Sequence, residues 1–146
     1  MDKELLTRIR QALLSSWSPN TCDIFTKAMH SSYGQCAQTA IVVQEHFGGE
    51  ILQTSGWPPN GRHFYNRVDG ERLDFTAEQF SCNPQYQLQI SYADTPSNAF
   101  EAQTEASPIQ IATMRSAFSL ALQGQDERRH LLQARRNETS PPRLDE

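Results

Sequence analysis

Three side chains of this 146-residue sequence can act together in covalent chemistry: the thiol of Cys36, the imidazole of His63 and the carboxylate of Asp74. Cys36 opens a stretch with helical periodicity, and the other two residues fall in runs that predict adjacent strands. A nucleophile, a base and a group that orients the base are the parts of a thiol enzyme. We therefore expect a cysteine hydrolase or acyltransferase acting on an amide, thioester or isopeptide bond.

The predicted position of Cys36 favours a reactive thiol. At the start of a helix, unpaired backbone N–H groups and the positive end of the helix dipole stabilise a thiolate. His63 would accept the thiol proton and later protonate a leaving amine, while Asp74 would hold one imidazole tautomer. The backbone N–H of Cys36 is one candidate oxyanion donor, and the side chain of Gln35 is a candidate for the second.

The expected nucleophile helix covers residues 36–47. Gly48 or Gly49 can adopt the left-handed conformation that ends a helix. The apolar face of the expected helix carries Cys36, Ala40, Val43 and Phe47, with Ala37 and Ile41 beside them. The polar positions of the helix, away from this face, are Gln38, Gln44 and Glu45.

Asp69-Gly70 predicts a β-hairpin between residues 62–68 and 71–75, because both central residues of a type I′ turn need positive φ. A two-residue loop places His63 and Asp74 on one face as diagonal neighbours, roughly 7 Å apart. A slip of one residue would separate them. Core candidates on the other face are Phe64, Val68, Leu73 and Phe75.

The other expected elements support this centre. Asp2 can cap a helix that ends near Ser15-Ser16, and a second helix starts at Ser107-Pro108. Short strands are expected at residues 50–53 and 85–92, and a short turn between Thr76 and Phe80. The stretch 94–106 is interpreted as a polar connection.

The length is in the range of one domain. A hydrophobic fraction of 37% and a mean hydropathy of −0.64 indicate that part of the chain is polar tail rather than core. We expect a single α+β domain over residues 1–124 and a polar, flexible tail over 125–146, with a helix across 128–136 as the alternative.

Charge and composition restrict the partners. The formal net charge of −4 provides no electrostatic footprint for nucleic acid or an anionic membrane, and no apolar run approaches the length of a membrane span. We expect a cytoplasmic protein whose substrate is a protein, a peptide or a small amide, although a secreted effector would look the same. The three cysteines have no CxxC spacing, so neither a disulfide framework nor a zinc site is expected. The proposed chemistry needs no metal or organic cofactor.

Each candidate also has an ordinary structural interpretation. A buried helix cysteine is usually a small hydrophobe, and a lone strand histidine or turn-flanking acid usually has no catalytic role. Cys22 and Cys82 lack a predicted helix start and a basic partner, so structural or incidental roles are favoured. Trp17 and Trp57 can line a cleft or anchor the core. The alternative function is therefore a catalytically silent binding or regulatory module that retains the fold.

Several segments resemble the YunG-like family of small bacterial proteins over approximately the first 80 residues. The resemblance implies an α+β fold similar to papain-like and transglutaminase-like enzymes, with a nucleophile helix packed on a small antiparallel sheet. It assigns the nucleophile to Cys36, the base to His63 and the orienting acid to Asp74, and it implies no substrate. The segments that carry it are Trp17, Gly34-Gln35-Cys36, Thr39-Ala40, Val42-Val43-Gln44, residues 47–52, His63-Phe64-Tyr65-Asn66-Arg67, Asp69-Gly70, Asp74-Phe75-Thr76 and Gln79-Phe80.

Overall fold

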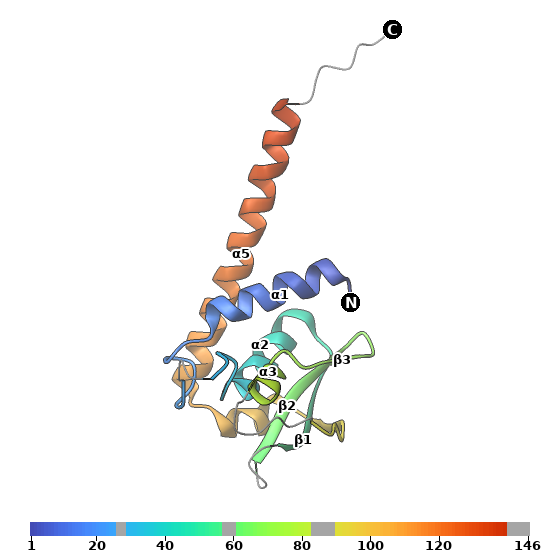
Figure 1. Ribbon diagram of the computed structural model, residues 1–146, viewed down its shortest axis with the longest axis vertical. Coiled ribbons are helices and arrows are strands. Elements are labelled where there is room, and N and C mark those ends of the chain that lie inside the picture. Colours follow the sequence, from blue (N-terminus) through green and yellow to red (C-terminus); the bar gives the residue numbers. More distant parts are fainter. Residues whose placement is uncertain (26–28, 57–60, 83–89, 140–146) are drawn as a thin grey trace.

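A computed structural model of the chain describes residues 1–25, 29–56, 61–82 and 90–139. Over these residues the fold is α+β, with a four-stranded antiparallel sheet in the order β3-β2-β1-β4 (Figure 1). The strands are β1 (Glu50–Gly56), β2 (Gly61–Val68), β3 (Glu71–Leu73) and β4 (Thr95–Ser97). The helices are α1 (Lys3–Ser16), α2 (Cys36–Phe47), α3 (Glu78–Ser81), α4 (Ala99–Ala102) and α5 (Pro108–Thr139), with a 3₁₀ helix, η1 (Gln103–Glu105).

α1 begins and ends where the sequence predicts. The side chain of Asp2 caps it by accepting a hydrogen bond from the backbone N–H of Glu4. Ile9 is fully buried, and the helix packs against α5. Trp17, the next residue after the helix, belongs to the core and donates from Nε1 to Oγ1 of Thr39 at 2.9 Å. Of the two roles considered for Trp17, the structure favours the core anchor.

α2 lies at the centre of the molecule, with both ends where they are predicted. Gly48 follows it with a φ of 74° and ends the helix. α2 contacts β1 and β2 and also α5, so its first two turns are buried all round. Gln38, which the sequence places away from the apolar face, is only 1% exposed. Its amide nitrogen donates to backbone carbonyls of the preceding loop, which gives this buried donor its partners.

The junction between α2 and β1 leaves no room for a side chain. Gly49 has a φ of 78°, and a Cβ at this position would lie 2.1 Å from the backbone oxygen of Arg67. Only glycine combines this conformation with such a close approach. β1 then pairs with β2 along its whole length, so the strand extends beyond the residues 50–53 predicted for it.

β2 and β3 form the predicted hairpin. Asp69 and Gly70 have φ values of 52° and 79°, as a type I′ turn requires. Val68 pairs with Glu71, which is the predicted register. β3 ends at Leu73, two residues before its predicted end. The predicted core residues of the hairpin are all buried: Phe64, Val68, Leu73 and Phe75.

The stretch from residue 90 to residue 106 differs from the prediction. Most of the strand expected at 85–92 lies outside the described residues, and residues 90–92 are not in a strand. The expected polar connection instead contains β4 and α4. β4 pairs with β1 at the edge of the sheet, where Pro96 is tolerated because an edge strand leaves one side unpaired. Asn98 caps α4 by accepting a hydrogen bond from the backbone N–H of Glu101.

α5 begins at Pro108 as predicted but continues to Thr139. Residues 125–139 are helical, which agrees with the alternative of a helix across 128–136 rather than with the expected flexible tail, and residues 140–146 lie outside the described part. Between 125 and 139 the sequence has no Gly or Pro and is rich in good helix formers. Gln125 also fastens this region to α1, because its Nε2 donates to the backbone oxygen of Arg8 at 2.9 Å.

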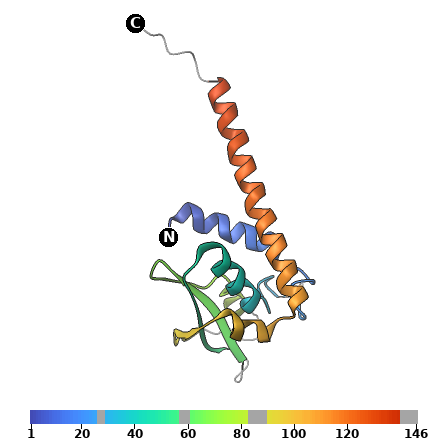
Figure 2. The ribbon, with the colours of Figure 1, turned by 180° about the vertical axis from the view of Figure 1, so that it is seen from behind.

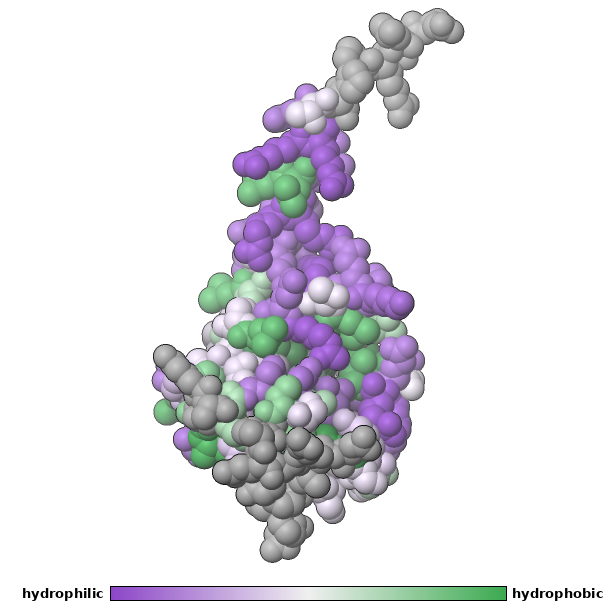
Figure 3. Space-filling view, in the orientation of Figure 1, coloured by the Kyte–Doolittle hydropathy of each residue, from purple (hydrophilic) through white to green (hydrophobic). Residues whose placement is uncertain are grey.

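The far half of α5 projects from the body of the molecule in both ribbon views (Figures 1 and 2). Its surface is mostly hydrophilic in Figure 3, although Leu131 and Leu132 are exposed there. Over the residues described, no helix is both long and apolar enough to cross a bilayer.

Buried side chains of the described residues form two core clusters on either side of α2. The first joins α1, α2, the hairpin and α5, through residues that include Ile9, Val42, Val68 and Phe118. The second joins the beginning of α2 to β1, β2, α4 and α5, through Ala37, Ala40, Ile41, Ile51, Phe64, Ala102 and Ile111. Because both clusters include α2, they fix the position of its N-terminus, and therefore of Cys36, relative to β2.

Candidate functional site

The hairpin brings His63 and Asp74 into contact. Nε2 of His63, on β2, lies 2.7 Å from Oδ2 of Asp74, which directly follows β3. The prediction that the register brings these two side chains together is confirmed. Oδ1 of Asp74 accepts hydrogen bonds from the backbone N–H and the hydroxyl of Thr76, at 3.2 and 3.3 Å. The carboxylate is therefore fixed in orientation by the turn that carries it.

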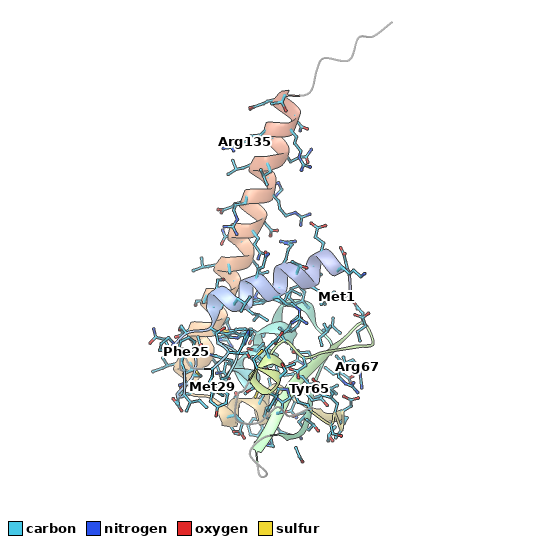
Figure 4. All side chains as sticks on the ribbon, viewed as in Figure 1. Met1, Phe25, Met29, Tyr65, Arg67 and Arg135 are labelled. Carbon is cyan, nitrogen blue, oxygen red and sulfur yellow. The ribbon has the colours of Figure 1, made fainter. Side chains whose placement is uncertain are left out.

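The imidazole of His63 is 1% exposed and held between aromatic rings. Tyr65 stacks on it at 5.7 Å between centroids, and Phe80 of α3 meets it edge-on at 4.8 Å. Figure 4 shows Tyr65 on β2 within the body of the molecule, well away from Arg135 near the far end of α5. Nδ1 of His63 has no hydrogen-bond partner among the described residues, although it is buried. A buried, unpaired nitrogen of this kind is uncommon in proteins.

Three influences determine the charge of His63. Burial lowers the pKa of the ring, but the hydrogen bond with Asp74 and the neighbouring Cys36 raise it more, to about 9. At neutral pH the ring is therefore an imidazolium. An imidazolium can stabilise an adjacent thiolate and can donate a proton to a leaving group.

Cys36 is the first residue of α2, half-buried and free of any disulfide. Its sulfur lies close enough to His63 to raise the pKa of the ring, although it does not meet the geometry of a hydrogen bond with Nδ1. Gly34, two residues earlier, has a φ of 77°, and a Cβ there would lie 2.7 Å from Cγ1 of Ile24. The loop that leads into Cys36 therefore needs glycine at this position.

Cys36 and His63 line one cavity of about 260 Å³. Charged and polar groups surround it, and they are paired across the rim: Arg62 with Glu105 at 3.1 Å, and Gln110 with Asp23 at 2.5 Å. The other residues that line the cavity are Cys22, Ile24, Tyr33, Gly34, Ala37, Gln38, Gln79 and Phe80.

Gln35 does not have the position that an oxyanion donor needs. Its side chain is fully buried, and the cavity lining among the described residues does not include it. Its amide oxygen accepts from Thr21 Oγ1 at 2.8 Å, and its amide nitrogen donates to the sulfur of Cys22 at 3.2 Å. Gln35 therefore holds the loop before α2 in place, and the geometry does not support the oxyanion role predicted for its side chain.

Sequence reasoning missed two residues of the site. Tyr92 donates from its hydroxyl to Oδ2 of Asp74 at 2.7 Å. Gln79 of α3 donates to Thr76 Oγ1 at 3.0 Å and accepts from the backbone N–H of Gly34 at 3.4 Å, so it connects the acid's turn to the nucleophile's loop. Both contacts cross parts of the chain that lack periodicity, and the only available signal was the position of Gln79 within the segments that resemble the family.

The other cysteines and the second tryptophan considered in the sequence differ in their surroundings. Cys22 lines the same cavity as Cys36, and burial raises the pKa of its thiol. Cys82 is exposed. Trp57 lies outside the described residues. Among the residues that the structure describes, His, Cys, Asp and Glu side chains form no group of three that could hold a metal ion.

Comparison with known proteins places the chain in a family. The sequence model of the family described as YunG protein matches residues 5–123. The chain belongs to the YunG family. The family match extends well past residue 80, where the resemblance seen in the sequence weakens. A YunG relative from Bacillus subtilis (strain 168), described as an uncharacterized protein, is 37% identical over 117 residues, which cover 78% of this chain and 91% of the relative. No solved structure matches the chain.

Proposed function

We propose that this YunG family member is a cysteine hydrolase or acyltransferase with Cys36 as the nucleophile. One observation carries the proposal: the hydrogen bond between His63 Nε2 and Asp74 leaves Nδ1 buried and unpaired in the cavity that Cys36 also lines. A histidine oriented on one nitrogen by an acid, with its other nitrogen available to a thiol, is the arrangement that thiol catalysis uses.

In the proposed resting state, the proton of the Cys36 thiol has already moved to Nδ1 of His63, so the two side chains form a thiolate–imidazolium pair. The thiolate attacks the carbonyl carbon of an amide, and the backbone N–H groups of the first turn of α2 stabilise the resulting oxyanion, because they have no partner within the helix. The imidazolium then protonates the leaving amine, and a thioester remains on Cys36. Attack by water or by an amine on the thioester breaks the bond between the acyl carbon and the sulfur and releases the Cys36 thiolate, while His63 accepts a proton from the attacking molecule. Water gives a carboxylic acid, and an amine gives a new amide.

The fold that we propose is papain-like or transglutaminase-like. The support for it is the packing of α2, with Cys36 at its first residue, against β1 and β2 of an antiparallel sheet. This arrangement delivers a thiol from a helix N-terminus to a histidine on a strand.

The dimensions of the cavity suit a small acyl group. A volume of about 260 Å³ accommodates a single side chain or a small amide rather than a large ligand. At the rim, Arg62 pairs with Glu105, and the carboxylate of Asp23 binds only the neutral amide of Gln110, so these groups provide no excess of positive charge for a polyanionic substrate. We infer that the acyl donor is a carboxamide, thioester or isopeptide on a protein, a peptide or a small molecule.

Competitive alkylation tests the proposal. With iodoacetamide at pH 6 to 7, we expect Cys36 to react about tenfold faster than Cys82, as a thiolate beside an imidazolium should. Cys82 is a stringent control, because it is exposed whereas Cys36 is half-buried. His63→Ala should abolish the difference. Peptide mapping by mass spectrometry gives the rates, and the proposal fails if Cys82 reacts at least as fast as Cys36 in the wild-type protein.

One observation favours a second candidate, a binding or regulatory module. The far half of α5 projects from the body and offers a contact surface distinct from the cavity (Figures 1 and 2). In that case Cys36 would alkylate slowly and without dependence on His63. The same labelling experiment therefore separates the two functions.

A further inference from the structure

We propose that Tyr92 is a positioning residue of this site, which controls the strength of the bond between Asp74 and His63. Oδ2 of Asp74 accepts hydrogen bonds from Tyr92 and from His63, each at 2.7 Å. The two donors therefore compete for the charge of one oxygen atom. The consequence for catalysis rests on the function proposed above, whereas the coupling between Tyr92 and His63 can be measured without a substrate.

The environment of Asp74 makes each of its hydrogen bonds matter. Its side chain is 5% exposed, so water contributes little to stabilising the negative charge. Described residues supply four donors: two from Thr76 on Oδ1, and one each from Tyr92 and His63 on Oδ2. Hydrogen bonds to a charged group in such surroundings are stronger than those between neutral groups.

Tyr92 is held in place from three sides. Its ring meets Tyr65 edge-on at 4.9 Å between centroids, and the guanidinium of Arg72 lies over it at 4.6 Å. On either side of Tyr92, the hydroxyl of Thr54 donates to the carbonyl of Ser91 at 2.8 Å and accepts from the N–H of Ala93 at 3.0 Å. A side chain restrained in this way reaches Asp74 without further ordering of the segment.

Asp94 fastens the end of the same segment to the hairpin. Its carboxylate accepts a hydrogen bond from the hydroxyl of Tyr65 at 2.9 Å and forms an ion pair with Arg72. Asp94 has a φ of 53°, a left-handed conformation that aspartate tolerates better than most residues. The chain therefore turns sharply just after Tyr92 and is pinned to β2 and β3.

The hydroxyl of Tyr92 remains a donor across the working pH range. Burial raises its pKa, and the hydrogen bond to Asp74 raises it further. It therefore stabilises the carboxylate at every pH at which His63 titrates. Without this donor, the carboxylate would attract the imidazolium more strongly, and the pKa of His63 would rise.

The test is an NMR titration of the His63 ring nitrogens in the full chain, in Tyr92→Phe and in Tyr65→Phe. Tyr65→Phe is a matched control, because it also removes one buried hydroxyl but one that contacts Asp94 rather than Asp74. We expect the pKa of His63 to rise by about 0.5 in Tyr92→Phe and to stay within about 0.2 in Tyr65→Phe. The groups that face His63 in these variants are otherwise unchanged: Cys36 from α2, Asp74, and the rings of Tyr65 and Phe80.

A double-mutant cycle separates an effect of Tyr92 that acts through Asp74 from a general loosening of the structure around His63. In an Asp74→Asn background, Tyr92→Phe should leave the His63 titration where it is, because the shared oxygen has lost its charge. An unchanged pKa in Tyr92→Phe, an equal change in Tyr65→Phe, or the same effect of Tyr92→Phe in both backgrounds would each overturn the positioning role.

This test and the alkylation test fail independently. If Cys36 reacts slowly but Tyr92→Phe raises the pKa of His63, the proposed function is wrong and the coupling stands. If Cys36 reacts rapidly and the titration is unaffected, Tyr92 is a packing residue of a working site.

Discussion

Asp74 directly follows β3 and Asp94 directly precedes β4. The two acids have similar partners, but they differ in what those partners can do. Each carboxylate accepts a hydrogen bond from a tyrosine hydroxyl and pairs with a basic side chain. Asp94 pairs with Arg72, which stays charged at every physiological pH. Asp74 pairs with His63, which can lose its proton as the pH rises through about 9.

The surroundings of the two acids strengthen this contrast. The hydrogen bonds from Arg72 are the main cause that lowers the pKa of Asp94, to about 2, and its side chain is 23% exposed. Asp74 is 5% exposed and faces a ring whose own pKa is raised to about 9. The pair of Asp94 with Arg72 is partly solvated and permanently charged, so it can hold a loop in place. The pair of Asp74 with His63 is buried, and its histidine can bind and release a proton. This difference supports the proposed role of Asp74 in the chemistry and a structural role for Asp94.

Removing the acid from the buried pair should have the largest effect. Asp74→Asn leaves His63 buried without its counter-ion, and we expect a loss of about 3 kcal/mol in the free energy of unfolding at pH 7. Alkylation of Cys36 at pH 7 should also fall about tenfold, because burial alone lowers the pKa of the ring. Urea unfolding and peptide mapping measure the two effects.

Asp94→Asn is the matched control for that variant. It should destabilise the fold less, because its ion pair with Arg72 is more solvated, and it should leave the alkylation of Cys36 within about twofold of wild type. Equal losses in the two variants would remove the distinction between the acids.

The wild-type protein should lose stability in alkaline solution. The pKa of His63 rises from 6.5 in the unfolded chain to about 9 in the folded protein, so the folded state binds the proton more tightly. The stabilisation is complete below pH 6.5 and is lost as the pH rises through 9, by about 3 kcal/mol in total. Urea unfolding across this range gives the slope, and His63→Gln is the reference that should lack it. Parallel curves for the two proteins would contradict the raised pKa.

The smallest effect is expected in acid, where the stabilisation by Asp94 is lost as the pH falls, whereas that by His63 is lost as the pH rises. Because the pKa of Asp94 is lowered to about 2, its contribution to stability is present above pH 4 and is lost as the pH falls through 2. The difference in urea midpoint between wild type and Asp94→Asn should therefore shrink between pH 4 and pH 2. A difference that stays constant over this interval would show that the carboxylate charge is not what holds the loop.

The parts of the site that could be predicted from the sequence are those that depend on neighbouring residues along the chain. The helix that carries Cys36 follows from apolar spacing and a glycine stop, and the contact of His63 with Asp74 follows from the Asp-Gly turn between their strands. Both features depend on rules that act over a few residues. They could be predicted because no distant part of the chain has to be placed first.

Contacts that depend on tertiary placement were not predicted. The position of Tyr92 beside Asp74 depends on the pairing of β4 with β1 and on the turn of the chain at Asp94. Gln35 is next to the nucleophile in sequence, yet the loop before α2 buries its amide against Thr21 and Cys22. Polar residues in non-periodic segments carry no local signal for their partners. The extension of α5 was predicted only as the alternative, a helix across 128–136, because the charged composition was interpreted first as disorder.

Gly49, at the junction between α2 and β1, lies directly against the backbone of β2. A Cβ at Gly49 would lie 2.1 Å from the backbone oxygen of Arg67, so the chain at this junction has no room for any other residue. Even a methyl group at Gly49 would wedge β2 away from the helix at the end opposite to the nucleophile. We expect a tilt of this kind to change the distance between Cys36 and His63, although Gly49 lies at the other end of the helix from Cys36.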